Sequence, residues 1–163
     1  MIGETYSELL ARNLFISPIG AQVAESVLFY DFSGFIGNYA RIDSYSVLTG
    51  NVIINDWVHI SPFSFLSATG GVIEFKGSSG LGSHSAVLTT SDDYSLPRTS
   101  GKPKIKGNVS IGENTIIGSN CVILPNTEIG LNCIVGSGVI LNGCVRDNTK
   151  IVSAASRWIM VNK

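Results

Sequence analysis

The sequence predicts an all-β protein whose chain coils into a three-sided solenoid, with one short helix before the coils and one loop extruded from them. Three observations carry this prediction. Large aliphatic residues recur every six positions, small or β-branched residues recur four positions after them, and 18 glycines punctuate the chain. A period of six fits neither the 3.6-residue turn of a helix nor the two-residue alternation of a single strand, whereas short strands separated by regular bends produce it.

The six-residue repeat runs in three phased blocks. The repeated positions are Ile36, Ile42, Leu48, Ile54, Ile60, Leu66 and Val72 in the first block, Phe75, Leu81 and Val87 in the second, and Ile105, Ile111, Ile117, Ile123, Ile129, Val135 and Leu141 in the third. We expect each side chain to point inward from a flat face. The residue four positions later fills the corner, and Gly or Asn bends the backbone there. Three such faces make one coil of about 18 residues.

Two segments fall outside the repeat. Thr5 and Glu8 have the spacing of a capping box, so we expect a short helix over residues 4–13 that caps the solenoid. Residues 89–104 are polar, contain two prolines and interrupt the repeat, which predicts an extruded loop, the usual place for binding and catalytic groups. Residues 21–30 fit either a helix or a strand, and we favour a strand. The expected single domain thus comprises a cap helix (4–13), first coils (19–88), the extruded loop (89–104), last coils (105–146) and a C-terminal cap (147–163).

Composition and charge exclude several classes of protein. The chain has 11 Lys and Arg against 12 Asp and Glu, a formal net charge of −1, so we expect no nucleic-acid surface. Charged residues make up 14% of the chain against a usual value of about 25%, which indicates a large buried fraction. No run approaches the roughly 18 apolar residues of a membrane span, and the N-terminus lacks a signal-peptide pattern. Three cysteines without close pairs predict reduced thiols in the cytoplasm and no zinc site.

Several short motifs inside the repeat point to a known family. These are the dyads Ile36-Gly37, Ile111-Gly112, Ile117-Gly118, Ile129-Gly130 and Val135-Gly136, together with Ile123-Leu124-Pro125. Over about residues 19–159 the chain resembles the hexapeptide-repeat acyltransferases, most of all the galactoside and xenobiotic type and the sugar O-acetyltransferases of O-antigen and capsule. The resemblance implies a left-handed parallel β-helix, a homotrimer with active sites between subunits, and acetyl-CoA as co-substrate without a metal. The handedness rests on the resemblance alone, because crossover connections are usually right-handed.

Acyl transfer from a thioester to a hydroxyl needs a base for the hydroxyl proton, a donor for the developing oxyanion and a groove for the acyl carrier. The chain has two histidines, His59 and His84, so the choice of a base at neutral pH is narrow. We expect His59 at a corner with its side chain outward, as a general base at the cleft between subunits. The alternative is a corner histidine packed against Trp57 or Phe63.

The extruded loop supplies the second candidate catalytic group. In the galactoside-type family the catalytic histidine would fall at position 92, where this chain has Asp92, which can orient an imidazole from a facing subunit or hold an acceptor hydroxyl. The run from Ser91 to Tyr94 resembles a signature of O-antigen and capsule-type acyltransferases, and it makes Asp93 and Tyr94 candidate substrate-binding residues. A solvated Asx turn is the alternative for both aspartates. Pro62, near His59, and His84, expected on a flat face, are further candidates for contact with the substrate.

The coenzyme A site is expected along stacked corners with small side chains. Ser119 aligns with a family residue whose backbone N–H lies by the thioester, and Gly136 and Ser137 align with the pantetheine contact one coil later. Arg157 and Lys150 can meet the phosphates of the coenzyme. The alternative is that the small residues only shape the corners.

These features predict a cytoplasmic, acetyl-CoA-dependent O-acetyltransferase that acts on a sugar or nucleotide sugar in surface-polysaccharide (O-antigen, lipopolysaccharide or capsule) biosynthesis. One alternative is N-acetylation of a nucleotide-linked amino sugar, where the amine is the better nucleophile and the base matters less. Another is a non-catalytic structural or interaction β-helix, although such a solenoid has no reason to extrude a loop. A zinc lyase of the γ-carbonic-anhydrase kind needs three histidines per metal and is nearly excluded by two.

Overall fold

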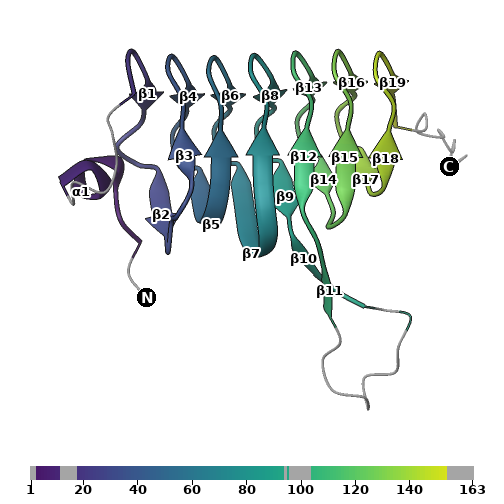
Figure 1. Cartoon of the computed structure of the whole chain (residues 1–163), viewed down its shortest axis with the longest axis horizontal. Coiled ribbons are helices and arrows are strands. Elements are labelled where there is room, and N and C mark those ends of the chain that lie inside the picture. The colour runs from purple at the N-terminus through teal and green to yellow at the C-terminus, as the bar shows by residue number, and fades with distance from the viewer. Residues whose placement is uncertain (1–2, 12–17, 94, 96–103, 154–163) are drawn as a thin grey trace, which may run out of the picture.

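Short parallel strands stack around a common axis and wind the chain into a solenoid (Figure 1). The computed structural model of the protein describes residues 3–11, 18–93, 95 and 104–153. Equivalent strands of successive coils pair in parallel register, as β4 (Arg41–Ile42) does with β6 (His59–Ile60). The predicted all-β parallel β-helix is therefore confirmed, and residues 21–30 form strands, as favoured by the sequence.

The solenoid has three faces. The first face consists of β1 (Gln22–Val23), β4, β6, β8 (Gly80–Leu81), β13 (Ile116–Ile117), β16 (Ile134–Val135) and β19 (Lys150–Ile151). The second face consists of β2 (Leu28–Tyr30), β9 (Ala86–Leu88), β14 (Val122–Ile123), β17 (Ile140–Leu141) and the first parts of β5 (Val47–Ile54) and β7 (Phe65–Phe75). The third face consists of β3 (Phe35–Ile36), β12 (Val109–Ile111), β15 (Thr127–Ile129), β18 (Cys144–Val145) and the last parts of β5 and β7, which continue around the corner between the second and third faces.

The repeated aliphatic side chains fill the interior. Ile36, Leu48 and Ile123, for example, are fully buried, and each such side chain contributes about 1.5–3 kcal/mol. Most residues four positions later are buried small side chains, as predicted, and the hydroxyls of the buried Ser and Thr among them bond to backbone carbonyls. The Ser64 hydroxyl donates to the Ser61 carbonyl at 2.7 Å, for example. Among the described residues no buried side-chain polar atom lacks a hydrogen-bond partner.

Two of the predicted inward positions are wrong. The register between β5 and β7 passes from Gly50 opposite Ala68 to Val52 opposite Ile73, so β7 carries three extra residues at its corner. Val72 belongs to this insertion and is half-buried, while Ile73 and Phe75 fill the interior. The insertion is the physical cause of the three-residue phase shift in the repeat. Ile105 lies in β11 and is exposed, because the extruded segment extends further than predicted.

The extruded segment begins as an antiparallel hairpin of β10 (Thr90–Asp92) and β11 (Lys104–Lys106). It leaves the solenoid at the corner between the second and third faces, between β9 and β12 (Figure 1). This confirms a loop at the predicted place, lengthened by residues 105 and 106. Because hydrogen-bonded strands hold its base, the first residues of the loop have fixed positions.

The two ends of the solenoid differ from each other. At the first coil α1 (Tyr6–Ala11) lies within the predicted helix of residues 4–13, of which residues 12 and 13 lie outside the described residues. The Thr5 N–H donates to Glu8 Oε2 at 2.7 Å and the Glu8 N–H donates to Thr5 Oγ1 at 3.3 Å, which is the predicted capping box. At the other end β19 still extends the first face, so part of the predicted C-terminal cap is one more strand.

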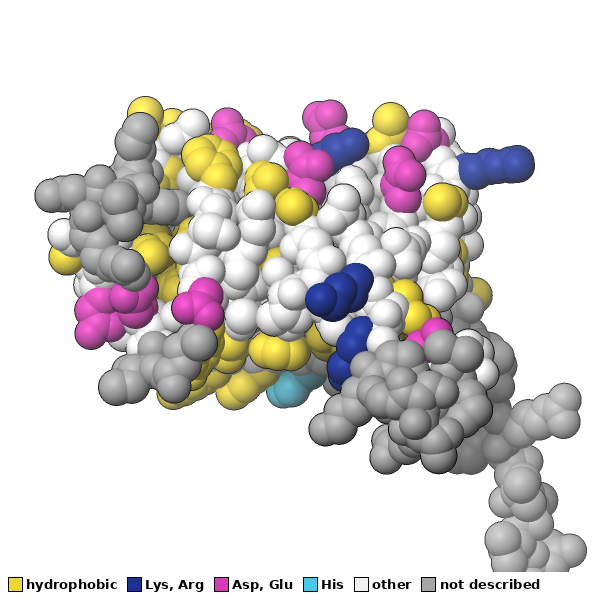
Figure 2. Space-filling model, turned by 60° about the horizontal axis from the view of Figure 1, so that its bottom comes forward, with side chains coloured by type: hydrophobic (Ala, Val, Ile, Leu, Met, Phe, Trp, Pro, Cys, Tyr) yellow, Lys and Arg dark blue, Asp and Glu magenta, His cyan; other side chains and the backbone are white. Residues whose placement is uncertain are grey.

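Large apolar side chains also lie on the outside. Figure 2 shows hydrophobic side chains in a row along the lower edge of the solenoid, whereas the upper edge carries acidic, basic and hydrophobic side chains together. The most exposed are Ile140, Ile19, Val152, Tyr45 and Trp57. Within the described part of the chain, no helix is long and apolar enough to cross a membrane.

Candidate active site

His59 lies on the first face, in β6, rather than at a corner as predicted. The corner is two residues earlier, where Trp57 has a φ of 63°. The imidazole points outward as expected, with 42% of its side chain exposed. Its Nε2 lies 2.8 Å from Oδ2 of Asp43, so its polar partner is a carboxylate.

Arg41, Asp43 and His59 form a charged network on the outer side of the first face. The Nε and Nη2 of Arg41 donate to the two carboxylate oxygens of Asp43, each at 2.8 Å. The network exists because β4 and β6 place Arg41 directly beside His59 in the parallel register. The hydrogen bond from Arg41 lowers the pKa of Asp43 from 3.8 to about 2 against the effect of burial, and His59 contributes in the same direction.

The network suits a base. Because the Asp43 carboxylate is ionised at neutral pH, it accepts a hydrogen bond, and the imidazole donates through Nε2–H. The lone pair of a neutral imidazole is then on Nδ1, and this atom can accept a proton from a substrate. Sequence reasoning identified His59 but missed Arg41 and Asp43.

Asp92 and Asp93 lie at the base of the hairpin. Asp92 stands opposite Lys104 across the strand pair and forms an ion pair with its ammonium group. Asp93 accepts hydrogen bonds through Oδ1 from the N–H and the hydroxyl of Ser95, at 2.9 and 2.6 Å, which is the turn weighed as the alternative. These hydrogen bonds, from the hydroxyl first, lower the pKa of Asp93. Tyr94 lies outside the described residues.

The two candidate catalytic residues do not come together within one chain. The hairpin with Asp92 leaves the corner between the second and third faces, and His59 lies on the first face, in β6. Figure 1 shows β6 at the top of the solenoid and the hairpin at the bottom. A reaction that uses both side chains therefore needs two copies of the chain.

Five of the candidate binding residues share the corner between the first and second faces, where they follow β6, β8, β13 and β16. His84 lies at this corner with a φ of 58°, and not on a flat face as predicted. Its ring stacks on Phe63 with 4.9 Å between the centroids, and its N–H donates to the Pro62 carbonyl at 3.1 Å. The structure thus brings Pro62 and His84 together.

Ser119 and Ser137 continue this corner on the next two coils. The Ser119 N–H donates to Ser137 Oγ at 3.2 Å, so the N–H expected to face an oxyanion already has a partner. Gly118 is tightly packed, since a Cβ there would lie 2.6 Å from the Ser137 nitrogen. Gly136, in the same row, donates its N–H to the Ile151 carbonyl at 2.7 Å. The backbones of neighbouring coils are therefore closely spaced at this corner, and this spacing by itself requires glycine at position 118.

Of the two basic residues expected near the coenzyme phosphates, one is described. Lys150 lies in β19 on the first face, beside Ile134, with an exposed side chain. Arg157 lies outside the described residues.

Sequence reasoning also missed a set of exposed aromatic residues at the corners. Tyr39, Tyr45, Trp57 and Phe63 each follow an inward Ile by three positions, so their shared phase in the repeat was available as a signal. Two stacks result. The rings of Tyr39 and Trp57 stack at 4.3 Å between centroids, and that of Tyr45 stacks on Phe63 at 5.2 Å. The stacks stand at the two corners that flank the first face, on either side of the charged network.

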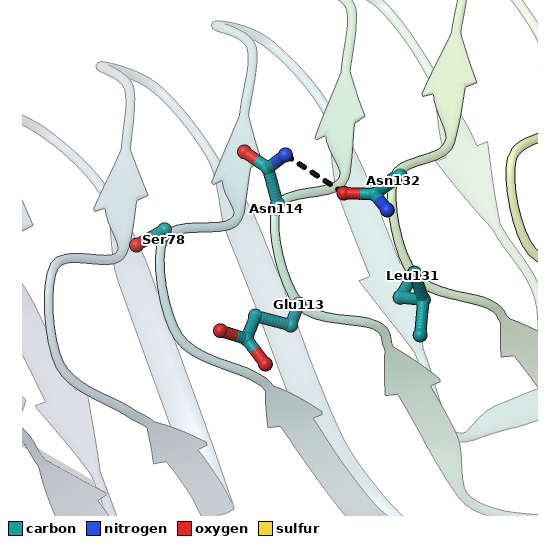
Figure 3. Close-up of a pocket in the computed structure, with 5 residues that line it drawn as sticks. All are labelled: Ser78, Glu113, Asn114, Leu131 and Asn132. Atoms are coloured by element: carbon teal, nitrogen blue, oxygen red, sulfur yellow. Dashed lines mark hydrogen bonds between the residues drawn. The ribbon is translucent and has the colours of Figure 1, made fainter.

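A hollow of about 390 Å³ opens at the corner between the third and first faces. It is lined by Ser78, Glu113, Asn114, Leu131 and Asn132 (Figure 3). Asn114 Nδ2 donates to Asn132 Oδ1 at 2.8 Å across adjacent coils. None of the residues singled out from the sequence lines this hollow.

Comparisons with known proteins agree with this architecture. Residues 108–143 match the model of the bacterial transferase hexapeptide family (six repeats). A search of curated proteins found no match to the sequence.

Among solved structures, AntD, an N-acyltransferase from Bacillus cereus in complex with dTDP and 3-hydroxybutyryl-CoA, is 25% identical with a TM-score of 0.79, over 99% of this chain and 92% of that one. PerB from Caulobacter crescentus, in complex with CoA and GDP-perosamine, is 19% identical with a TM-score of 0.55, over 89% of this chain and 60% of that one. A hexapeptide-repeat-containing acetyltransferase from Vibrio cholerae is 20% identical with a TM-score of 0.52, over 93% of this chain and 77% of that one.

The similarities to PerB and to the Vibrio cholerae acetyltransferase, at 19% and 20% identity, show the fold alone. Together with the family match, they confirm the resemblance on which the sequence analysis relied: the chain carries the hexapeptide repeat of the bacterial transferases and folds as they do.

Proposed function

We propose that the protein is a coenzyme A-dependent N-acyltransferase that acylates the amino group of a nucleotide-linked sugar. The observation that carries this proposal is the likeness to AntD along nearly the whole chain, at 25% identity, because AntD has been crystallised with 3-hydroxybutyryl-CoA and with dTDP-4-amino-4,6-dideoxyglucose. PerB, crystallised with CoA and GDP-perosamine, has the same combination of ligands. Amide formation on a nucleotide-linked amino sugar, weighed as an alternative from the sequence, thus becomes the preferred reaction.

The corner between the first and second faces is the proposed binding surface for the acyl-CoA. Gly118, Ser119, Gly136 and Ser137 leave a row without bulk along which the pantetheine arm can lie. Among the described residues, Lys150, which is exposed on the last coil, is the cation proposed to bind the phosphates of the coenzyme. Because the Ser119 N–H is bonded to Ser137 Oγ at 3.2 Å, Ser137 must turn its hydroxyl away before that N–H can face the thioester oxygen.

The hairpin is the proposed acceptor site. A sugar amine at neutral pH is partly protonated, and the neutral amine that attacks the thioester needs little further help from a base. An ionised carboxylate attracts the ammonium form and accepts its proton, which is the role proposed for Asp92. Asp93 is the second candidate for this role. AntD has been crystallised as variants of a serine and of an aspartate that lies ten residues after it. In this chain Asp93 lies ten residues after Ser83.

The active site is proposed to lie between copies of the chain, in a homotrimer. The support is geometric, because Asp92 and the first face stand on opposite sides of one solenoid (Figure 1). The second face also carries outward apolar side chains that a neighbour can cover, since Phe65 and Ile140 are exposed. A monomeric mass in light scattering would contradict this part of the proposal. A place in surface-polysaccharide assembly in the cytoplasm stays a prediction.

The test is a transfer assay with two matched acceptors. Purified protein is given acetyl-CoA or 3-hydroxybutyryl-CoA together with dTDP-4-amino-4,6-dideoxyglucose or its 4-hydroxy counterpart, and the acylated sugar is identified by mass spectrometry. The proposal requires transfer to the amine and little or none to the hydroxyl. Transfer to neither acceptor, combined with no binding of coenzyme A in calorimetry, would favour a structural β-helix instead.

O-acylation stays the second candidate because of one observation, the 2.8 Å contact between His59 and Asp43. A hydroxyl has to lose its proton during attack, and an imidazole oriented by a carboxylate is suited to take it. The variants His59→Ala and Asp92→Asn separate the two reactions. If amino-sugar turnover persists in the first and is abolished in the second, O-acylation through His59 is excluded.

A further inference from the structure

One corner position of the repeat has an unusual residue choice in the second and third coils. At the two corners that flank the first face, and at Asn126 on the third corner, the residue three positions after the inward side chain has a positive φ, between 55° and 63° for the non-glycine residues from Tyr39 onwards. In the later coils this position holds residues that tolerate the left-handed region, namely Asn114, Asn120, Asn126, Asn132, Gly138 and Asn148. In the second and third coils it holds Tyr39, Tyr45, Trp57 and Phe63. A bulky residue with positive φ is a backbone outlier, and outliers of this kind concentrate at functional sites.

Trp57 is the exposed end of one aromatic stack. One face of its ring stacks on Tyr39, with 4.3 Å between centroids and 14° between the planes. The opposite face points along the solenoid toward the next coil, and 61% of the residue is exposed. Because His59 pairs with Gly80, the residue of the next coil that is equivalent to Trp57 is Ser78. The stack therefore ends where a serine leaves the indole face uncovered.

The hollow described above begins at this serine. Ser78 is its first lining residue, and the amides of Asn114 and Asn132 and the carboxylate of Glu113 follow along the corner (Figure 3). These groups are donors and acceptors suited to the edge of a planar heterocycle. Glu113 is the one charged residue of the lining, so a neutral ring fits better than a phosphate.

We propose that the uncovered face of Trp57 is a stacking platform for the nucleobase of the acceptor, with the polar lining of the hollow facing the edge of the base. The inference rests on the proposed function in its choice of ligand, because a nucleotide-linked acceptor supplies such a base. Stacking on an aromatic ring accepts any base, whereas the amides at the edge select among bases. The platform lies on the third coil, away from the small-residue row proposed for coenzyme A.

Two variants with opposite effects on the stack test the platform. Trp57→Asn installs the residue that the chain itself uses at this corner in later coils, so the fold tolerates it. Ser78→Tyr lengthens the stack and covers the indole face, as Trp57 covers Tyr39. If the stack were only structural, the first variant would lower stability and the second would raise it, with nucleotide affinity unchanged in both. If Trp57 is a platform, both variants weaken dTDP binding by about tenfold. The variant Trp57→Phe, which keeps a stacking ring, retains most of the dTDP affinity of the native protein.

Binding is read from the indole itself. The chain has two tryptophans, so a Trp158→Phe background leaves Trp57 as the only tryptophan, and its fluorescence is excited selectively. dTDP is expected to quench its fluorescence, while pyrophosphate, which lacks a base, is not. Quenching by coenzyme A but not by dTDP would overturn the assignment to the acceptor. Unchanged dTDP affinity in Trp57→Asn, or a change confined to the oligomeric mass, would overturn the platform.

The transfer assay keeps this inference separate from the proposed function. Absence of transfer to any amino sugar, together with quenching by dTDP that Ser78→Tyr abolishes, would refute the proposed function and support the platform. Transfer with an unaltered KM for the dTDP-linked amino sugar in both variants would support the function and refute the platform. The KM for acyl-CoA is the internal control, and it is expected to stay unchanged in both variants.

Discussion

The charged network on the first face makes a quantitative prediction about stability and pH. Replacing Asp43 by Asn removes the acceptor of two hydrogen bonds from Arg41 and one from His59, each at 2.8 Å. The pKa of Asp43 is about 2 in the folded chain against an ordinary 3.8. At about 1.36 kcal/mol per pH unit, this difference corresponds to about 2 kcal/mol in favour of the folded state.

The expected effect is smaller than that figure. The side chains of Arg41 and His59 are 53% and 42% exposed, so water and salt screen their attraction to the carboxylate. We expect Asp43→Asn to cost about 1 kcal/mol at pH 7. Because the folded pKa is the lower one, the stabilisation is complete above about pH 4 and is lost as the pH falls toward 2.

Urea unfolding from pH 7 to pH 2 measures both the size and the sign. At pH 7 the midpoint of Asp43→Asn should lie about 0.3–1 M below that of the native protein. The difference should shrink below pH 4 and on addition of 1 M salt. Arg41→Gln serves as the control, since it removes the largest cause of the lowered pKa and should abolish most of the pH dependence. A native chain and an Asp43→Asn variant with parallel stability curves from pH 7 to pH 2 would refute the reasoning.

Other predictions concern the coils themselves. Ile123→Ala should lower the free energy of unfolding by about 2–5 kcal/mol, because the side chain is fully buried, and chemical denaturation will show it. Gly118→Ala should cost about 1–3 kcal/mol in the same experiment, since its Cβ would lie 2.6 Å from backbone; an unaltered midpoint would contradict the packed row. In the native state a thiol reagent should modify the exposed Cys144 rapidly, while Cys121 and Cys133, which are buried, should react only on unfolding; mass spectrometry separates the two classes.

The fold was predictable because one physical requirement recurs in each turn. A strand of two or three residues buries one aliphatic side chain, and the next strand starts after a bend. Buried aliphatic residues such as Ile111, Ile117 and Ile123 therefore recur every six positions in the sequence. The failures fall where the period is broken. Val72 continues the count of six, but three inserted residues in β7 shift the true inward positions to Ile73 and Phe75. Counting in sequence cannot tell an insertion at a corner from a change of phase between strands.

The site was predictable only in part, because its contacts join different coils. The small residues Ser119 and Ser137 were singled out through the family resemblance, and the structure places them in contact. The partner of His59 is 16 residues away in sequence, at a position fixed by the pairing of β4 with β6. A regular coil has 18 residues, which is the separation of His59 from Arg41, whereas Asp43 lies two residues after Arg41. The contact between His59 and Asp43 therefore depends on the directions of the side chains as well as on the register of the strands.

The geometry of the solenoid explains why fold and function separate so cleanly along this chain. In each six-residue repeat one large aliphatic side chain and one small side chain hold the interior, and the outward positions of each face and corner are free to vary without cost to the core. A chemical group placed on one face is then held rigidly but is turned away from groups on the other sides, as His59 is from Asp92. Within one solenoid only neighbours along the axis can cooperate, which is how Arg41, Asp43 and His59 meet. Chemistry that needs groups from two sides of the triangle therefore has to be assembled between copies, which is why the proposed trimer places the hairpin of β10 and β11 against a neighbour.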